Sequence, residues 1–464
     1  MRVSGARTIR FGLAAAALAI VGAMALSAFR ARSFRSRSET APQLPRPLAP
    51  APPAPSDGRD WPQWRGPNRD GHARSAHIAD RWPTSGPPIL WHRPTSGPGY
   101  SGLTIVSGRL YTMMQDGPYE AVVCWDAASG TERWRYRYRA RFVSDQGSGP
   151  RATPTYDQGR LYTVGATGVV HCLDAQTGRA LWRVDLVREL GGRVPAWGVS
   201  FSPLVYRRFV FVVVGGEPDR AIAALDKETG RTVWHNLDDP PAYASPVLAE
   251  TDGRLQVLFF TARGLVSVEP ETGRLYWRYP WTTPMDCNIA TPLVWQDLVF
   301  ISSGYGRGAA LLRITPRPGG ALAITELYRT KTMRNHFSTS VLYNGYVYGF
   351  DETRLKCLEL QTGRTMWHQG GFRKGSLIAA DGKLIVLGEQ GRLALLRATP
   401  ERYEELGQVR LCRHRTWTPP SLAQDRLFVR CDREIFCLDL SANAGQRLAH
   451  AGRGTRRVRE VKKP

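Results

Sequence analysis

Short runs of apolar and small residues, separated by turn residues, repeat along most of the chain. The five residues Gly-Arg-Leu-Tyr-Thr at 108–112 recur unchanged at 159–163. A shorter run precedes each of them, at 101–106 and 152–156, and a further apolar run such as 122–126 follows. Runs of this length, bounded by glycine and polar residues, are typical of β-strands. The pattern therefore predicts repeated units built only from strands.

The most regular mark of the repeat is a turn glycine with a tryptophan four residues after it and an acid four residues before it. Glycine supplies a positive φ, and an acidic side chain at this place can accept hydrogen bonds from the turn N–H groups. We therefore interpret the acids as structural. The five sets of acid, glycine and tryptophan are Asp126, Gly130 and Trp134; Asp174, Gly178 and Trp182; Asp226, Gly230 and Trp234; Glu269, Gly273 and Trp277; and Glu359, Gly363 and Trp367.

Counting the repeats gives eight units of roughly 40–50 residues with four strands each, a period typical of a β-propeller. Units five and seven lack the Thr-Gly turn, and unit eight lacks a fourth strand. A strand at 89–92, which contains Trp91, stands alone before unit one. We therefore predict an all-β, eight-bladed β-propeller of four-stranded antiparallel blades, whose ring is closed by this N-terminal strand.

The repeat G-x-L-Y…A-L-D-x-x-T-G-x-x-x-W resembles the tryptophan-docking repeat of pyrroloquinoline-quinone-like (PQQ-like) propellers, over about residues 89–440. That superfamily includes quinoprotein dehydrogenases and the BamB-type propeller lipoprotein of the outer-membrane β-barrel assembly machine. The segment Asp60-Trp61-Pro62-Gln63-Trp64-Arg65-Gly66-Pro67-Asn68-Arg69-Asp70-Gly71 resembles the leader of exported members. The resemblance implies that tryptophans dock between blades, namely Trp91, Trp134, Trp182, Trp234, Trp277 and Trp367.

The chain divides into five segments. Residues 1–40 contain an uncharged apolar run at 11–29 that follows Arg2, Arg7 and Arg10, and they read as an export signal or membrane anchor. Whether this segment is cleaved stays open. Residues 41–59 form a proline-rich linker, and residues 60–88 form a leader that is expected to pack on the propeller. Residues 89–445 form the propeller, and residues 446–464 form a basic tail that is expected to be disordered. We predict a periplasmic or cell-envelope location, with attachment to the inner membrane through residues 11–29 if they remain.

The charge distribution and the cysteines limit which partners and bound groups we expect. The net charge is +23, but residues 1–40 and 446–464 each contribute +6, and no basic stripe crosses the repeats, so we expect no nucleic-acid partner. Four of the seven cysteines, Cys124, Cys172, Cys357 and Cys437, share one repeat position and read as core residues. Cys412 and Cys431 could form a disulfide, which would be compatible with export. No zinc-ligand spacing is present, and we expect no bound metal.

Propellers bind ligands where the innermost strands begin. The residues just before those strands include three cations and one carboxylate, and they could hold an anionic cofactor or a peptide. The alternative is that the mouth of any propeller is polar because it meets water. The set is Arg151, Trp197, Tyr243, Asp286, Asn288, Asn335, His336, Arg373, Lys374 and Trp417.

Resemblance to quinoprotein dehydrogenases would imply a calcium site, a catalytic aspartate and often a pair of consecutive cysteines. No such cysteine pair exists, and only Asp286 and Asn288 suit calcium. We therefore predict an exported, non-catalytic, monomeric scaffold for envelope proteins or peptides, similar to BamB, with no cofactor. The alternatives are a PQQ-dependent alcohol or sugar dehydrogenase, in which Asp286 would be catalytic and PQQ and calcium bound, and a polysaccharide-binding module.

Overall fold

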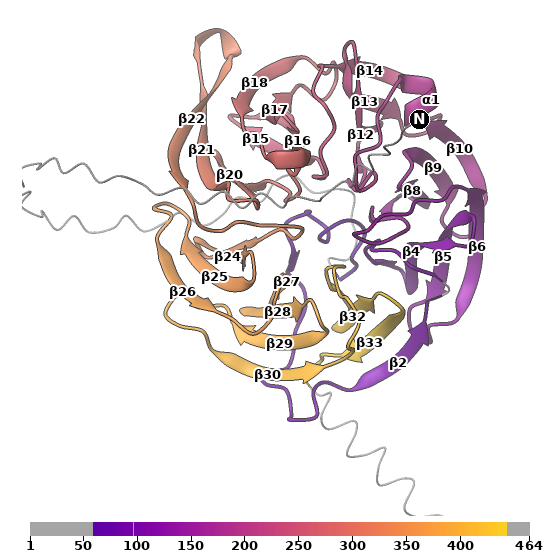
Figure 1. The fold of residues 1–464 in the computed structure, drawn as a ribbon, viewed down its shortest axis with the longest axis vertical. Coiled ribbons are helices and arrows are strands. Elements are labelled where there is room, and N and C mark those ends of the chain that lie inside the picture. The colour runs from indigo at the N-terminus through magenta and orange to yellow at the C-terminus, as the bar shows by residue number, and fades with distance from the viewer. Residues whose placement is uncertain (1–58, 96, 443–464) are drawn as a thin grey trace, which may run out of the picture. The chain divides into compact units, whose positions relative to one another are not determined.

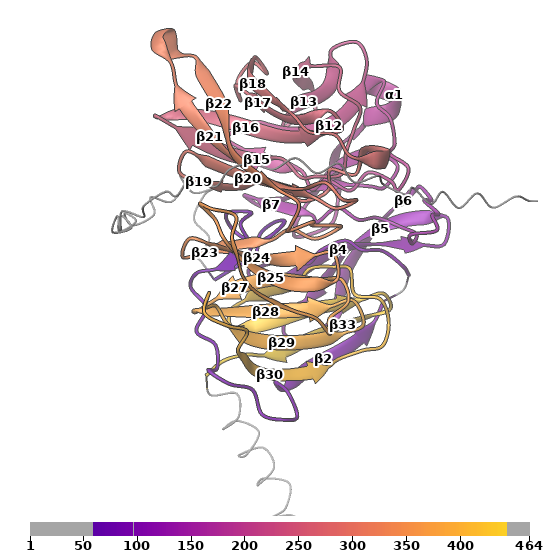
Figure 2. The same ribbon diagram turned by 60° about the vertical axis from the view of Figure 1, so that its left-hand side comes forward.

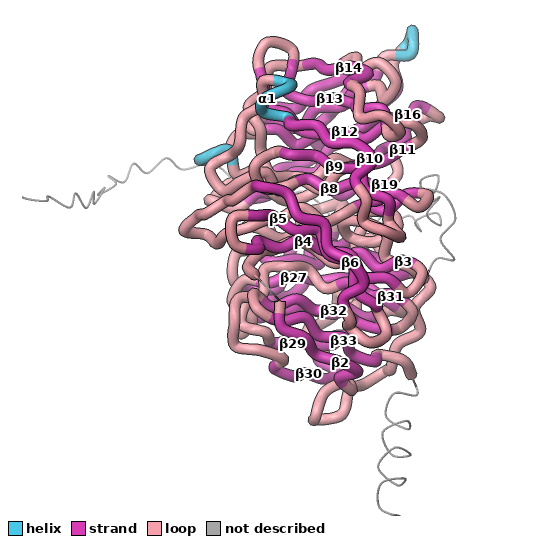
Figure 3. The backbone as a smooth tube through the Cα atoms, turned by 90° about the vertical axis from the view of Figure 1, so that its right-hand side faces the viewer, coloured by secondary structure: helices cyan, strands magenta, loops and turns pink. Residues whose placement is uncertain are grey.

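The computed structural model describes residues 59–95 and 97–442. It consists almost entirely of strands and loops (Figure 3), with one short helix, α1 (Leu186–Leu190), and two 3-10 turns, Pro284–Asp286 and Pro318–Gly320. The described residues contain no helix that is long and apolar enough to cross a membrane. The predictions of a signal or anchor at 1–40 and of a tail at 446–464 lie outside the described residues, as does nearly all of the linker at 41–59.

Eight antiparallel sheets follow one another around a central axis (Figure 1), which confirms the predicted eight-bladed propeller. We number the blades 1 to 8 in chain order. Blades 1 to 4 consist of β3 (Thr104–Val106), β4 (Arg109–Asp116), β5 (Tyr119–Asp126) and β6 (Glu132–Arg139); β7 (Thr155–Asp157), β8 (Arg160–Val164), β9 (Val169–Asp174) and β10 (Ala180–Asp185); β11 (Leu204–Tyr206), β12 (Phe209–Gly216), β13 (Arg220–Asp226) and β14 (Thr232–Asn236); and β15 (Val247–Thr251), β16 (Arg254–Thr261), β17 (Gly264–Val268) and β18 (Leu275–Pro280).

The first strand of each blade lies nearest the axis, where the first strands of blades 8, 1, 2 and 3, and those of blades 6 and 7, contact one another. In blade 5 the last two strands form a long hairpin that projects from the ring (Figure 2). Blades 5 to 8 consist of β19 (Leu293–Trp295), β20 (Leu298–Ser303), β21 (Gly308–Pro316) and β22 (Leu322–Thr330); β23 (Val341–Tyr343), β24 (Tyr346–Asp351), β25 (Arg354–Glu359) and β26 (Thr365–Gln369); β27 (Gly375–Ala380), β28 (Lys383–Gly388), β29 (Arg392–Arg397) and β30 (Glu405–Arg410); and β31 (Ser421–Ala423), β32 (Arg426–Cys431), β33 (Glu434–Asp439) and β2 (Ile89–Pro94).

Blade 8 takes its outermost strand from the other end of the chain. β2 pairs antiparallel with β33, with Trp91 opposite Cys437 and Pro94 opposite Glu434. The Trp91 indole then reaches blade 1, where its N–H donates to the Ala127 carbonyl at 3.0 Å. β2 therefore contacts both the last blade and the first.

Tryptophans of the repeat contact the turn of the following blade. A side chain at the turn glycine would collide with the indole, as at Gly230 beneath Trp182, so glycine is required for this close approach. Trp277 is the exception, because its N–H donates to Gln256 of its own blade and the next blade carries the β21–β22 hairpin in place of the tight turn. The other five donate to turn carbonyls at 2.8–3.2 Å: Trp91 to Ala127, Trp134 to Ala175, Trp182 to Lys227, Trp234 to Pro270 and Trp367 to Thr399.

The turn acids are structural, as interpreted from the sequence. The Asp126 carboxylate accepts the backbone N–H groups of Ala128 and Ser129, at 3.0 and 2.9 Å, and pairs with Arg133. That guanidinium, together with the turn hydrogen bonds, lowers the pKa of Asp126 to about 2. Asp174 and Asp226 make the same backbone bonds.

We expect Trp182→Ala and Trp367→Ala each to lower the free energy of unfolding by about 3 kcal/mol, because each removes a large ring from between two blades. Thermal or urea unfolding measures the loss. Trp197→Ala, a tryptophan that lies outside these turns, is the control and should cost less. Unchanged unfolding in the first two variants would contradict a docking role.

The leader packs against the propeller. Its first part contacts the innermost strands, and its later part reaches the outermost strand of blade 7, where the Leu406 carbonyl accepts the Trp82 N–H at 3.1 Å. It runs through the middle of the ring in Figure 1, in indigo. Trp61 exchanges backbone hydrogen bonds with Ile105 of blade 1, and Gly71 accepts one from Ala379 of blade 7. β1 (His72–Ala73) then adds a parallel strand beside β27. The first part of the leader thus crosses the centre of the ring.

Two buried arginines fix the leader in this position. Arg69 donates to the carbonyls of Ser202 and Pro203 in blade 3, at 2.8 and 3.1 Å. Arg65 donates to the corresponding segment of blade 6, at the carbonyls of Thr339 and Ser340. Burial lowers the pKa of Arg65 to about 10 and that of Arg69 to about 9. Blades 3 and 6 are therefore linked through the centre by charged side chains bound to main-chain carbonyls.

Candidate ligand site at the mouth of the ring

One face of the ring carries the loops that lead from the outermost strand of a blade to the first strand of the next. We call it the mouth face; it also carries the turns between second and third strands, such as 304–307. The opposite face carries the tight turns that the tryptophans contact. All ten residues that the sequence assigned to the mouth lie on the loops of the mouth face, just before first strands.

An aromatic group joins three of these loops. The Trp417 ring centroid lies 5.4 Å from that of Tyr100 and 5.0 Å from that of Phe337. These residues precede blades 8, 1 and 6, so side chains from non-adjacent blades meet at the centre. The Trp417 N–H donates to the Glu389 carboxylate at 2.9 Å, which fixes the orientation of the indole.

The aromatic contacts continue on both sides of this group. The Arg151 guanidinium lies 4.8 Å from the Phe142 ring centroid and 5.8 Å from that of Tyr100, and burial lowers its pKa to about 10. On the other side, the ring centroids of His336 and Tyr305 lie 4.9 Å apart. Burial, together with the charge of Lys374, lowers the His336 pKa to about 4, so this imidazole is neutral at pH 7.

Trp197 and Tyr243 form a separate pair, with ring centroids 5.8 Å apart. Tyr243 is buried, and burial raises its pKa to about 12. Asp286 and Arg373 are exposed and have positive φ angles of 58° and 57°. Lys374 is half-buried, and burial lowers its pKa.

Two of the assigned residues serve the fold. Asn288 is fully buried; its amide donates to the carbonyls of Thr261 and Trp281, and its oxygen accepts the Ser303 hydroxyl. Asn335 is bonded in the same way, to the Phe350 carbonyl and the Ser340 hydroxyl. The Asn288 amide therefore has no N–H group left to offer to a ligand.

Calcium would need several oxygen ligands at one place. The Asn288 oxygen already accepts the Ser303 hydroxyl, and the amide hydrogens are donated to carbonyls. Asp286 is exposed on a neighbouring turn. Within residues 59–95 and 97–442, no three His, Cys, Asp or Glu side chains are grouped so that they could hold a metal ion. The residues at this mouth therefore do not fit the calcium site that the dehydrogenase resemblance implies.

Sequence reasoning missed Tyr100, Tyr305, Phe337 and Glu389. Tyr305 and Glu389 lie after second strands, where the repeat pattern marks only a turn, and Phe337 reads as an ordinary apolar residue beside His336. The predicted topology could have indicated Tyr305 and Glu389, because in each blade the turn between the second and third strands lies on the same face as the loop before the first strand.

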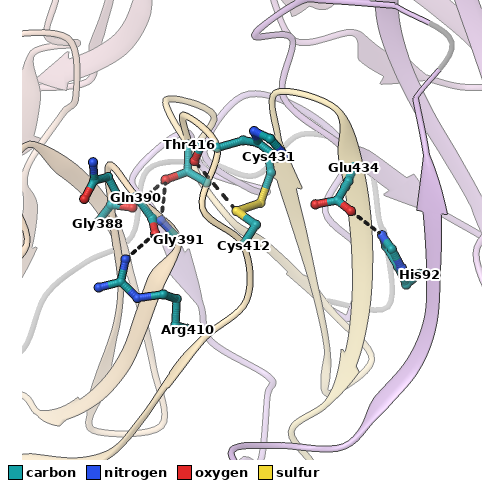
Figure 4. The surroundings of a disulfide bond; sticks show 10 residues. His92, Gly388, Gln390, Gly391, Arg410, Cys412, Thr416, Cys431 and Glu434 are labelled. Carbon is teal, nitrogen blue, oxygen red and sulfur yellow. Dashed lines mark hydrogen bonds and ion pairs between the residues drawn. A yellow bond between two sulfur atoms is a disulfide. The ribbon is translucent and has the colours of Figure 1, made fainter.

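The possible pair of cysteines is joined: Cys412 and Cys431 form a disulfide, with Cα atoms 6.9 Å apart (Figure 4). It connects the loop 411–420, which carries Trp417, to the end of β32. Thr416 of the same loop bonds Gly388 and Gly391 of blade 7 through its hydroxyl. The loop at the mouth is therefore covalently attached to blade 8 and hydrogen-bonded to blade 7.

A second polar cluster lies further from the axis on the same side, beside a cavity of about 490 Å³ that residues of blades 1 and 2 line. Glu120 is fully buried; it accepts the Tyr138 hydroxyl and, at 2.9 Å, the Ala166 N–H. Burial raises its pKa. His171 packs on Tyr138, with ring centroids 4.3 Å apart, and both its ring nitrogens lack a hydrogen-bond partner among the described residues.

Because His171 is buried, we predict that the free energy of unfolding depends on pH in a specific way. Burial lowers its pKa from 6.5 to about 3 in the folded chain. Below pH 6.5 the unfolded chain binds a proton that the folded chain does not, so stability falls as the pH falls toward 3. We expect a loss of about 2 kcal/mol between pH 7 and pH 5 from this group, and a smaller loss in His171→Phe. Urea unfolding at both pH values measures it, and equal losses in the two proteins would contradict the assignment.

Comparison with known proteins supports the resemblance. Residues 146–369 match the family model described as "Outer membrane protein assembly factor BamB". BamB of Yersinia pestis is 23% identical over 259 residues, which are 53% of this chain and 63% of that protein. Quinohemoprotein alcohol dehydrogenase ADH-IIG of Pseudomonas putida is 26% identical over 194 residues, 39% of this chain but only 25% of that enzyme.

Solved structures show the same fold at low identity. BamB from Moraxella catarrhalis superposes with a TM-score of 0.53 at 17% identity, covering 75% of this chain and 96% of that one. A europium-containing methanol dehydrogenase gives 0.63 at 12% identity, covering 82% and 98%. Residues 146–369 thus carry repeats of the PQQ-like, BamB-type kind, and the described chain has the eight-bladed propeller fold that BamB-like proteins and quinoprotein dehydrogenases share.

Proposed function

We propose that this chain is an exported, non-catalytic propeller that binds other proteins in the cell envelope, in the manner of BamB-like assembly factors. The observation that carries the proposal is a set of apolar side chains exposed on loops of the mouth face. Val143 is 65% exposed and Met285 62%, and Val194 and Tyr305 are exposed as well. Exposed apolar side chains on one face of a propeller are suited to protein–protein contact.

The backbone at Met285 supports this role. Met285 and Asp286 both have positive φ, which is unfavourable for residues with a Cβ. Methionine is unbranched and adapts to varied apolar surfaces. A side chain that already lies in solvent is available to a partner without being uncovered first.

In-cell photo-crosslinking tests the proposal. A photo-reactive amino acid in place of Met285 should form adducts with envelope proteins, and the same amino acid in place of Leu275 should not. Leu275 is also exposed but lies at the start of β18, beside a turn of the opposite face. Equal adduct formation at the two positions, or none at either, would remove the mouth face as the binding surface.

The alternative, a PQQ-dependent dehydrogenase, is favoured by the similarity to the Pseudomonas putida enzyme. It is opposed by the hydrogen bonding of Asn288 and the exposure of Asp286. We expect no turnover when the chain is given PQQ, calcium, alcohols or sugars and an artificial electron acceptor. Cation-assisted binding of PQQ at Arg151, Arg373 or Lys374 without turnover would be compatible with the scaffold. Cofactor-dependent turnover that Asp286→Asn abolishes would establish the dehydrogenase instead.

A further inference from the structure

One sector of the mouth face is rich in cations. Five cations gather on three of its connections, in blades 7 and 8, and we call them the cationic arc: Arg373, Lys374, Arg413, Arg415 and Arg433. Within residues 59–95 and 97–442, none of the five lies within 4.0 Å of a carboxylate oxygen. We propose that the cationic arc binds an acidic segment of the partner protein; this inference rests on the proposed function.

Backbone hydrogen bonds hold the three connections of the arc side by side. The Lys374 carbonyl accepts the Glu389 N–H at 2.7 Å, the Glu389 carbonyl accepts the Thr416 N–H at 2.9 Å, and the Arg415 carbonyl accepts the Asp432 N–H at 2.9 Å. The disulfide between Cys412 and Cys431 adds a covalent connection. The arc is therefore one surface with a fixed backbone.

Arg415 shows how the arc is presented. Its guanidinium lies 4.2 Å from the Trp417 ring centroid, and one of its nitrogens donates to the Tyr100 hydroxyl and the Gln146 carbonyl, at 3.3 Å each. Stacking on the indole orients the planar group while the residue stays exposed. A guanidinium held in this way is prepared to bind a carboxylate with paired hydrogen bonds.

The local charge balance favours an anion. Three carboxylates lie near the arc, Glu352, Glu389 and Asp432, and Glu389 is bonded to the Trp417 N–H. A sixth cation lies beneath: Arg430 is 1% exposed, donates only to uncharged groups of blade 1, and has two nitrogens without a partner among the described residues. Six cations against three carboxylates leave a local excess of positive charge.

The two basic end segments of the chain do not suit this surface. Residues 1–40 and 446–464 each carry a net charge of +6, so the arc repels them. The half-buried ring of Trp417 at the centre of the arc favours an acidic segment that also carries apolar side chains.

Fluorescence anisotropy of a labelled peptide of repeating Asp-Phe-Glu-Leu units, added to the full chain, tests the inference. We expect saturable binding that weakens with added salt. Arg373→Glu/Arg413→Glu should weaken it by about ten-fold or more. Arg179→Glu/Arg231→Glu makes the same change of net charge on exposed residues of the opposite face and should have little effect. Both variants alter surface residues, and thermal unfolding checks that they are folded.

Three outcomes would overturn the proposal. The first is that the unmodified chain does not bind the peptide. The second is equal weakening in both variants, which would show an effect of net charge alone. The third concerns vesicles of anionic phosphatidylglycerol. If Arg373→Glu/Arg413→Glu weakened binding to the vesicles but left peptide binding unchanged, the arc would be a lipid site. In each case, adducts at Met285 would still test the proposed function separately.

Discussion

A chain that begins at Thr95 is expected to aggregate or to unfold at a much lower temperature than one that begins at Asp60. The shorter chain lacks β2, so β33 loses its neighbour and blade 8 exposes a long apolar edge. It also lacks Trp91, which contacts blade 1 through the Ala127 carbonyl. Size-exclusion chromatography and thermal unfolding of both chains measure the effect.

A point variant separates the strand from the leader, which the shorter chain also lacks. Trp91→Ala keeps the leader and the pairing of β2 with β33 but removes the contact with blade 1. It should lower stability by about 3 kcal/mol and leave the chain monomeric. Equal stability of the chains that begin at Thr95 and Asp60 would show that the ring does not depend on β2, whose role in closing it stays a prediction.

The double variant Arg65→Met/Arg69→Met is expected to lose about 5 kcal/mol or more of unfolding free energy. Both side chains are buried, and together they serve four carbonyls in blades 3 and 6. Methionine fills similar space but donates no hydrogen bond. The carbonyls of Ser202, Thr339 and Ser340 would lose these bonds, at about 1–3 kcal/mol each, while the Pro203 carbonyl keeps the Thr155 hydroxyl. Denaturant unfolding gives the value.

Arg74→Met is the matched control. Arg74 lies in the same leader but is exposed, and its contact is an ion pair with Asp70 on the surface. Such pairs contribute about 0–1 kcal/mol. A loss in the double variant no larger than that of Arg74→Met would mean that the leader is not needed to hold the ring together.

The repeat pattern was sufficient to predict the blades because each blade is built from local signals. A turn glycine, an acid four residues earlier and a tryptophan four residues later specify two antiparallel strands and their register. The hairpin of blade 5 was only partly predicted: 311–315 and 324–328 were expected, but β21 and β22 extend further, to Gly308–Pro316 and Leu322–Thr330.

The course of the leader could not be predicted, because its partners are distant in sequence. Arg65 and Arg69 stand among Gly, Pro and Asp, which read as a surface turn, and the carbonyls that they bind belong to residues 202–203 and 339–340. The mouth was predicted in part for a related reason. Asn288 and Asn335 are polar, but composition does not show whether an amide bonds to solvent or to neighbouring backbone.

The pairing of β2 with β33 also bears on the order in which the chain can fold as it emerges. The side chains of His92 in β2 and Glu434 in β33 are bonded at 2.9 Å, and the two residues are 342 positions apart. A chain that leaves a ribosome or a translocation channel from its N-terminus must therefore expose β2 without its partner until the last blade arrives. Seven blades can form locally, but the eighth waits for synthesis to finish, so the slowest step of folding should be a single late event with a high contact order.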